Sequence, residues 1–170
     1  SSLAINLSLA DAEREFMYDC KVPHRHRHQD AVMEIESWGG WLKEKGATSV
    51  TVIGHSRGGN QTAWYATERI SEAVDKVVLI APATWSKTAA SQAYESRYKV
   101  SLATHMEKAD NLVRDGQGGS IMSPVGFLYC AQADVTADSF LAYYRPDKRF
   151  NTPDLLADIP RPTLVVAASD

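Results

Sequence analysis

Three short apolar segments set the strongest limit on how this chain can fold. Residues 49–54, 76–81 and 161–168 are each rich in β-branched and aliphatic side chains. Residues 30–45 and 57–70, on either side of the first segment, instead show the apolar spacing of helices. Fully apolar strands that alternate with helices are typical of a parallel sheet covered by helices on both faces. The sequence therefore predicts the α/β class, with a mostly parallel sheet.

Two further segments predict regular structure less directly. Residues 3–9 predict another strand, because apolar side chains occupy every second position. Residues 10–29 show no regular period and are expected to be mostly loop. Thr152, Pro153 and Asp154 have the composition of a helix start: a capping side chain, a proline in the first turn and an acidic residue.

The second and third apolar segments are separated by about seventy residues, far more than an ordinary connection in this class needs. We therefore expect one α/β domain over residues 1–170, interrupted by a helical insertion over residues 83–151. Within the insertion, apolar spacing predicts helices around residues 102–113 and 138–144. Residues 115–119 (DGQGG) predict a turn between them.

Composition excludes several classes of protein. Hydrophobic residues make up 44% and charged residues 23% of the chain, which is ordinary for a globular domain and unlike a disordered one. The formal net charge of −3 does not favour binding to nucleic acid, which needs a basic face. No apolar run approaches the ~20 residues of a membrane span. The oligomeric state stays open.

The motif Gly54-His55-Ser56-Arg57-Gly58 lies directly between a predicted strand and a predicted helix. This is the G-x-S-x-G pattern, in which a sharp turn projects the serine Oγ from the end of the sheet. We expect Gly54 and Gly58 to be glycines because side chains there would collide with neighbouring elements. The side chain of His55 is expected to pack or hydrogen-bond locally.

The helix that follows Ser56 supports a chemical role for this serine. The N-terminal end of a helix favours a developing oxyanion, and the backbone N–H of Arg57 is the natural donor. Two alternatives are a turn needed only for tight packing and a phosphate-binding loop. The phosphate loop is disfavoured because no lysine follows Gly58 and Gly59.

Five segments together resemble the α/β-hydrolase family. Residues 3–9 resemble its fourth strand, and residues 30–45 its helix before the nucleophile strand. VTVIGHSRGG (50–59) resembles the fifth strand and the nucleophile turn, and KVVLIAPA (76–83) the sixth strand. Residues 154–170 resemble the helix and seventh strand that deliver the catalytic acid. The insertion at 83–151 lies where members of this family have a cap.

The resemblance implies a serine hydrolase acting on an ester, thioester or amide of a small molecule. Ser56 would be the nucleophile, and the acid would be Asp170 or the residue after it. The catalytic histidine should follow the acid, but the last histidine is His105. We therefore expect an internal piece of a longer protein, inactive and poorly soluble on its own. The chemistry needs no metal or organic cofactor. A non-catalytic binding or interaction protein on the same fold is the alternative.

Three histidines alternate with arginines at His24, His26 and His28. On an extended segment their side chains would point the same way, which suits a metal site. The same pattern also fits a solvated basic loop, or a segment that lines the active site and attracts an anion. The sequence does not decide among the three.

Cysteines and aromatic residues leave two more questions open. Cys20 and Cys130 could be free thiols, which suits the cytoplasm. They could equally form a disulfide between the cap and the core, which would imply a periplasmic or secreted protein. Trp85, Tyr143 and Tyr144, with Phe140, could line a substrate pocket or simply fill a core.

Overall fold

The computed structural model describes residues 1–168, which form two compact units. One unit combines Ser1–Asp30 with Lys87–Arg145, and we call it the disulfide unit. The other combines Ala31–Ser86 with Pro146–Asp170, and we call it the sheet unit. Each unit is described by itself. Among the described residues, no helix combines the length and apolarity that crossing a bilayer requires.

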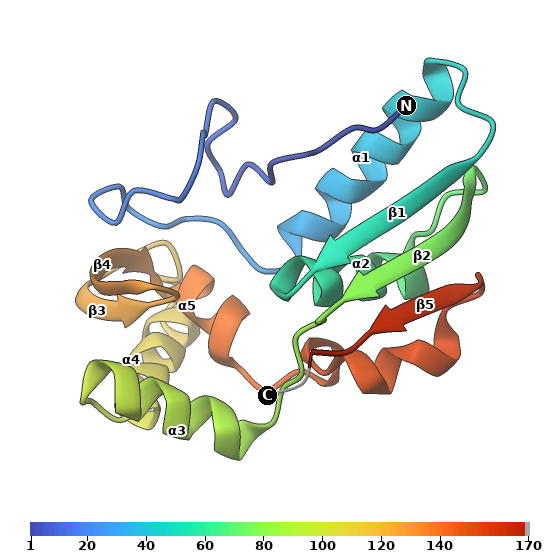
Figure 1. Ribbon diagram of the computed structural model, residues 1–170. Coiled ribbons are helices and arrows are strands. Elements are labelled where there is room, and N and C mark those ends of the chain that lie inside the picture. Colours follow the sequence, from blue (N-terminus) through green and yellow to red (C-terminus); the bar gives the residue numbers. More distant parts are fainter. Residues whose placement is uncertain (169–170) are drawn as a thin grey trace. The chain divides into compact units, whose positions relative to one another are not determined.

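The sheet unit is built on three parallel strands (Figure 1), in the order β1 (Val50–His55), β2 (Val74–Ile80) and β5 (Thr163–Val166). Helix α1 (Asp30–Glu44) precedes β1, and helix α2 (Arg57–Glu68) connects β1 to β2. All five elements were expected from apolar periodicity. This arrangement confirms the predicted α/β class with a parallel sheet.

Strand register separates the two faces of this sheet. Gly54 pairs with Leu79, and both are buried on the face that α2 covers. Ile53 and Leu164 occupy the alternate positions, where 63% and 59% of their surfaces are exposed. The sheet surface around Ile53 and Leu164 is therefore apolar and uncovered within the described residues.

Two 3₁₀ helices return the chain to α2 before β5 begins. They are η1 (Lys148–Phe150) and η2 (Thr152–Asp158), and Pro153 lies in the first turn of η2, as the sequence predicted. The guanidinium of Arg149 lies 4.3 Å from the Trp64 ring of α2 and hydrogen-bonds to the Asp147 carboxylate. That hydrogen bond raises the pKa of Arg149. These contacts attach the returning segment to α2.

The disulfide unit contains three helices and an antiparallel hairpin. The helices are α3 (Lys87–Tyr98), α4 (Leu102–Arg114) and α5 (Ala137–Tyr144). The hairpin pairs β3 (Ile121–Phe127) with β4 (Cys130–Thr136). Helices α4 and α5 were predicted. The hairpin was not, because a proline and a glycine interrupt β3 and polar residues interrupt β4.

Aromatic residues fill the core of the disulfide unit. Phe127 and Phe140 are fully buried, and Tyr94 packs edge-on against the rings of Phe140 and Tyr144. Tyr143 is also buried in this core. These residues fit the core interpretation left open above.

The strand predicted at residues 3–9 is wrong. This segment has no regular secondary structure and belongs to the disulfide unit, and Leu3 and Ile5 are exposed. Leu9 and Ala10 take positive φ angles of 51° and 65°, which end any extended run. A strand is stable only where a neighbour accepts its backbone hydrogen bonds, and a short alternating pattern cannot supply that neighbour.

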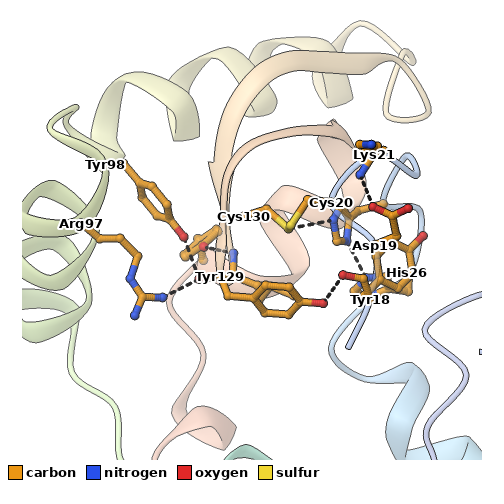
Figure 2. Close-up of a disulfide and its surroundings, with 12 residues drawn as sticks. Tyr18, Asp19, Cys20, Lys21, His26, Arg97, Tyr98, Tyr129 and Cys130 are labelled. Carbon is orange, nitrogen blue, oxygen red and sulfur yellow. Dashed lines mark hydrogen bonds between the residues drawn. A yellow bond between two sulfur atoms is a disulfide. The ribbon is translucent and has the colours of Figure 1, made fainter. Parts of the chain in front are cut away.

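Cys20 and Cys130 form a disulfide, with an S–S distance of 2.04 Å (Figure 2). The bond attaches the N-terminal segment to β4. Close by, the hydroxyl of Tyr129 donates to the backbone oxygen of Tyr18 at 2.5 Å. Of the two possibilities that the sequence left open, free thiols are wrong and the disulfide is correct. Both cysteines belong to the same compact unit rather than to a cap and a separate core.

Candidate active site

Ser56 lies at the turn between β1 and α2 in a backbone conformation that serine rarely adopts. Its φ and ψ are 54° and −122°, and its side chain is exposed. A non-glycine residue in such a region costs about 1–3 kcal/mol, which the surrounding structure must offset. Conformations of this kind cluster at active sites and ligand clamps.

Backbone hydrogen bonds hold the peptide groups on both sides of Ser56. Its N–H donates to the Ile80 carbonyl at 2.9 Å, which anchors the turn to the end of β2. Its carbonyl accepts from the N–H of Ala83 at 2.9 Å and from that of Asn60 at 3.2 Å. The turn is therefore held by β2, by the loop after β2 and by the first turn of α2.

The glycines around Ser56 differ in how much space they have. A Cβ at Gly54 would clash with Thr62 and lie 2.5 Å from the Gly58 carbonyl oxygen. A Cβ at Gly59 would lie 2.9 Å from Pro82 Cα. A Cβ at Gly58 would meet nothing within 4 Å. The expected crowding is thus confirmed at Gly54 and wrong at Gly58, and Gly59 is the second glycine with close neighbours.

The two residues beside Ser56 are both exposed. Arg57 is the first residue of α2, so its backbone N–H lies at the positive end of the helix dipole. His55 is the last residue of β1, and its side chain is exposed, so of the two expected arrangements, packing or a local hydrogen bond, packing is wrong.

A buried polar network lies beside the turn. The amide nitrogen Nδ2 of Asn60 donates to the Arg149 carbonyl at 2.9 Å and to Oγ1 of Thr152 at 3.2 Å. The Thr152 hydroxyl donates to the Ala83 carbonyl at 2.7 Å. Sequence reasoning did not identify this network. The available signal was the polar run Asn60-Gln61-Thr62 in the helix directly after the motif, and the structure buries all three residues.

The other members of a catalytic triad are not placed by this structure. Asp170 lies outside the described residues. Of the 5 histidines, only His55 belongs to the sheet unit. His105 lies on α4 of the disulfide unit, where burial, and next the charge of Lys108, lower the pKa of its imidazole.

The histidines between residues 24 and 28 form part of the core of the disulfide unit. His24 and His26 are fully buried, so the solvated-loop interpretation is wrong for these side chains. Their rings are joined by a 3.0 Å contact between His24 Nδ1 and His26 Nε2, and His26 Nδ1 lies 2.7 Å from the Tyr143 hydroxyl. Backbone hydrogen bonds join His24 to β4 on either side of Val135.

His24 also stacks on Tyr18, with ring centroids 4.3 Å apart. Burial lowers the pKa of His24 to about 4, so its ring is neutral near pH 7. These contacts are those of histidines that pack within a core.

Trp85 was expected either to line a pocket or to fill a core. It belongs to the sheet unit, where it is half-buried and packs edge-on against Phe150.

Comparison with protein families identifies the class of this chain. The family model described as the alpha/beta hydrolase fold matches residues 28–117, which is more than half of the sequence. The matched region contains β1, the Ser56 turn, α2 and β2. The chain belongs to the alpha/beta hydrolase fold family.

Comparison with solved structures finds a crystal structure of a monoacylglycerol lipase from Paleococcus ferrophilus. The two share 16% sequence identity, with a TM-score of 0.49 over 82% of this chain and 53% of that one. The chain therefore spans about half the length of that lipase. A search of curated proteins found no match.

Proposed function

We propose that this chain carries the nucleophile of a serine hydrolase. Ser56 Oγ attacks the carbonyl carbon of an ester, thioester or amide, and the backbone N–H of Arg57 binds the oxyanion that develops. A carboxylate after β5, at Asp170 or the next position, orients a histidine that takes the serine proton. The observation on which the proposal rests is the strained backbone of Ser56 at the junction of a strand and a helix.

The substrate in this proposal is a small molecule with an acyl group, and the reaction requires neither a metal nor an organic cofactor. Residues 83–151 act as the cap and determine which substrates are accepted. The Cys20–Cys130 disulfide supports an oxidising compartment, because disulfides rarely persist in a reducing cytosol.

A fluorophosphonate probe tests the nucleophile directly, because an activated serine attacks its phosphorus, displaces fluoride and becomes phosphonylated. We expect the full-length protein to be labelled and the Ser56→Ala variant to be unlabelled. Ser37→Ala is a matched control: Ser37 is an exposed serine of α1 in the same unit, and its loss should leave labelling unchanged. Undiminished labelling of the Ser56→Ala variant would show that a residue other than Ser56 is the nucleophile.

Turnover of a p-nitrophenyl ester tests whether the labelled serine is catalytic. The full-length protein should hydrolyse the ester in a Ser56-dependent manner. The 170 residues alone should lack useful activity, because removing members of a triad costs ~10⁴-fold or more. Absence of both labelling and turnover in the full-length protein would favour the non-catalytic alternative.

A further inference from the structure

We propose that Thr152 and Asn60 are positioning residues for Ser56. Acting through the backbone of Ala83, whose carbonyl and N–H belong to successive peptide groups, they hold the backbone of Ser56 in the orientation from which its hydroxyl attacks substrate. The inference rests on the proposed function of Ser56 as a nucleophile, and it assigns a role to two residues that do not touch substrate.

A continuous path of hydrogen bonds joins these residues to Ser56. Asn60 Nδ2 donates to Thr152 Oγ1 at 3.2 Å, and the Thr152 hydroxyl donates to the Ala83 carbonyl at 2.7 Å. The N–H of Ala83 then donates to the Ser56 carbonyl at 2.9 Å. Every member of the path belongs to the sheet unit.

The direction of each hydrogen bond in this path is determined. An amide nitrogen can only donate, so Thr152 Oγ1 accepts from Asn60 and its own proton is available for the Ala83 carbonyl. Asn60 and Thr152 are each only 1% exposed, so water does not replace a lost partner. Buried polar groups of this kind favour one arrangement strongly, because the alternatives leave a donor or acceptor unsatisfied.

Ser56 needs such support more than an ordinary residue does. Its φ of 54° lies in a region that a serine leaves when its surroundings permit. The Ala83 N–H is one of the two groups that hold its carbonyl, and Ala83 lies in the loop after β2 rather than in regular structure. A looser backbone at Ala83 would let the Ser56 turn relax and displace Oγ.

Thr152→Val tests this role, because valine keeps the shape of threonine and removes the hydroxyl. In the full-length protein we expect kcat for p-nitrophenyl ester hydrolysis and the rate of fluorophosphonate labelling to fall about 10-fold or more, with KM changed less than about twofold. Thr152→Ser restores the hydroxyl and should recover most of the lost rate.

Thr67→Val is the matched control. The Thr67 hydroxyl also donates to a backbone carbonyl, that of Trp64 at 2.8 Å, and it lies on α2 in the same unit but outside the path to Ser56. Its loss should leave kcat and labelling within about twofold of the wild type. A fall equal to that of Thr152→Val would overturn the positioning role.

Asn60→Asp provides a second test with little change in volume. The carboxylate cannot donate to Thr152 Oγ1 and instead competes with the Ala83 carbonyl for the threonine proton. We expect kcat to fall with little change in KM, as for Thr152→Val. Tryptophan fluorescence of each variant shows whether the sheet unit is folded, because all 4 tryptophans belong to it.

The possible results separate the two proposals. Labelling of Ser56 in the wild type, with unchanged rates in folded Thr152→Val and Asn60→Asp, overturns the positioning role and leaves the nucleophile in place. An unlabelled wild type overturns both. A loss of rate in Thr152→Val that Thr152→Ser does not recover also contradicts the positioning role, because it would assign the effect to packing.

Discussion

The two compact units of this chain use buried polar residues for different ends. In the sheet unit, the buried side chains of Asn60 and Thr152 lead by hydrogen bonds to an exposed residue with a strained backbone, Ser56. In the disulfide unit, the buried histidines His24 and His26 contact each other, Tyr143 and the hairpin. The polar atoms of these histidines interact only with residues of their own unit in the contacts described above.

This difference shows why residue type alone is a poor guide to function. Histidines at alternate positions suggested chemistry, and the fold buries them among aromatic rings. An asparagine and a threonine suggested nothing, and the fold connects them to the candidate nucleophile.

Three experiments test this contrast. Tryptophan and tyrosine signals report on the two units separately. All the tryptophans lie in the sheet unit, and every tyrosine except Tyr65 lies in the disulfide unit.

Removal of the disulfide should have the largest effect. The Cys20→Ala/Cys130→Ala double variant frees two residues 110 positions apart, and closing a loop of that length stabilises by about 5 kcal/mol. We expect the tyrosine near-UV signal to be lost at much lower denaturant, with a smaller change in the tryptophan transition. A reductant should reproduce this in the wild type and have no effect on the variant. Equal shifts of both signals would contradict an effect of the disulfide mainly on its own unit.

Acidification should have the next largest effect, again on the disulfide unit. Because burial lowers the pKa of His24 from 6.5 to about 4, the folded state holds its neutral form while the unfolded state binds a proton more readily. Stability from this group is present above pH 6.5 and falls as the pH drops towards 4, by about 3 kcal/mol in total. Denaturant unfolding followed by the tyrosine signal at several pH values measures this slope.

His24→Phe should reduce the dependence on pH, since an aromatic ring remains, the titrating group is lost and only the smaller contribution of His105 is left in this unit. His55→Asn is the matched control: it removes an exposed histidine of the sheet unit and should leave the slope as it is. An undiminished slope in His24→Phe would assign the acid sensitivity to other groups.

Glycine substitutions at the Ser56 turn should have the smallest effect on stability and act on the sheet unit alone. Gly54→Ala introduces a Cβ against Thr62 and should destabilise by about 2 kcal/mol, together with loss of fluorophosphonate labelling in the full-length protein. Gly58→Ala has open space and should retain both stability and labelling. Tryptophan fluorescence during denaturation measures the difference. Equal sensitivity at the two positions would contradict the geometry described for the turn.

Much of the sheet unit could be predicted from the sequence, because its signals are local. Apolar segments predicted β1, β2 and β5, and helical spacing predicted α1 and α2. The glycine pattern predicted that Ser56 lies at a turn between a strand and a helix. The N-terminal strand was wrong because residues 3–9 do not pair with a neighbouring strand among the described residues. Hairpin β3–β4 was missed because its strands contain a proline, a glycine and polar residues, and their pairing is decided by packing rather than by alternation.

The sequence alone was enough to assign the α/β class and the candidate nucleophile, since both follow from residue order over short spans of chain. Short spans of sequence could not assign three other features: the pairing of Cys20 with Cys130, the burial of His24, and the path from Thr152 to Ser56. These features join residues 69 to 110 positions apart, and such contacts exist only after the chain has closed large loops and buried its core. The conformation of Ser56 belongs to both groups: its motif marked the turn, and distant hydrogen bonds hold its backbone there.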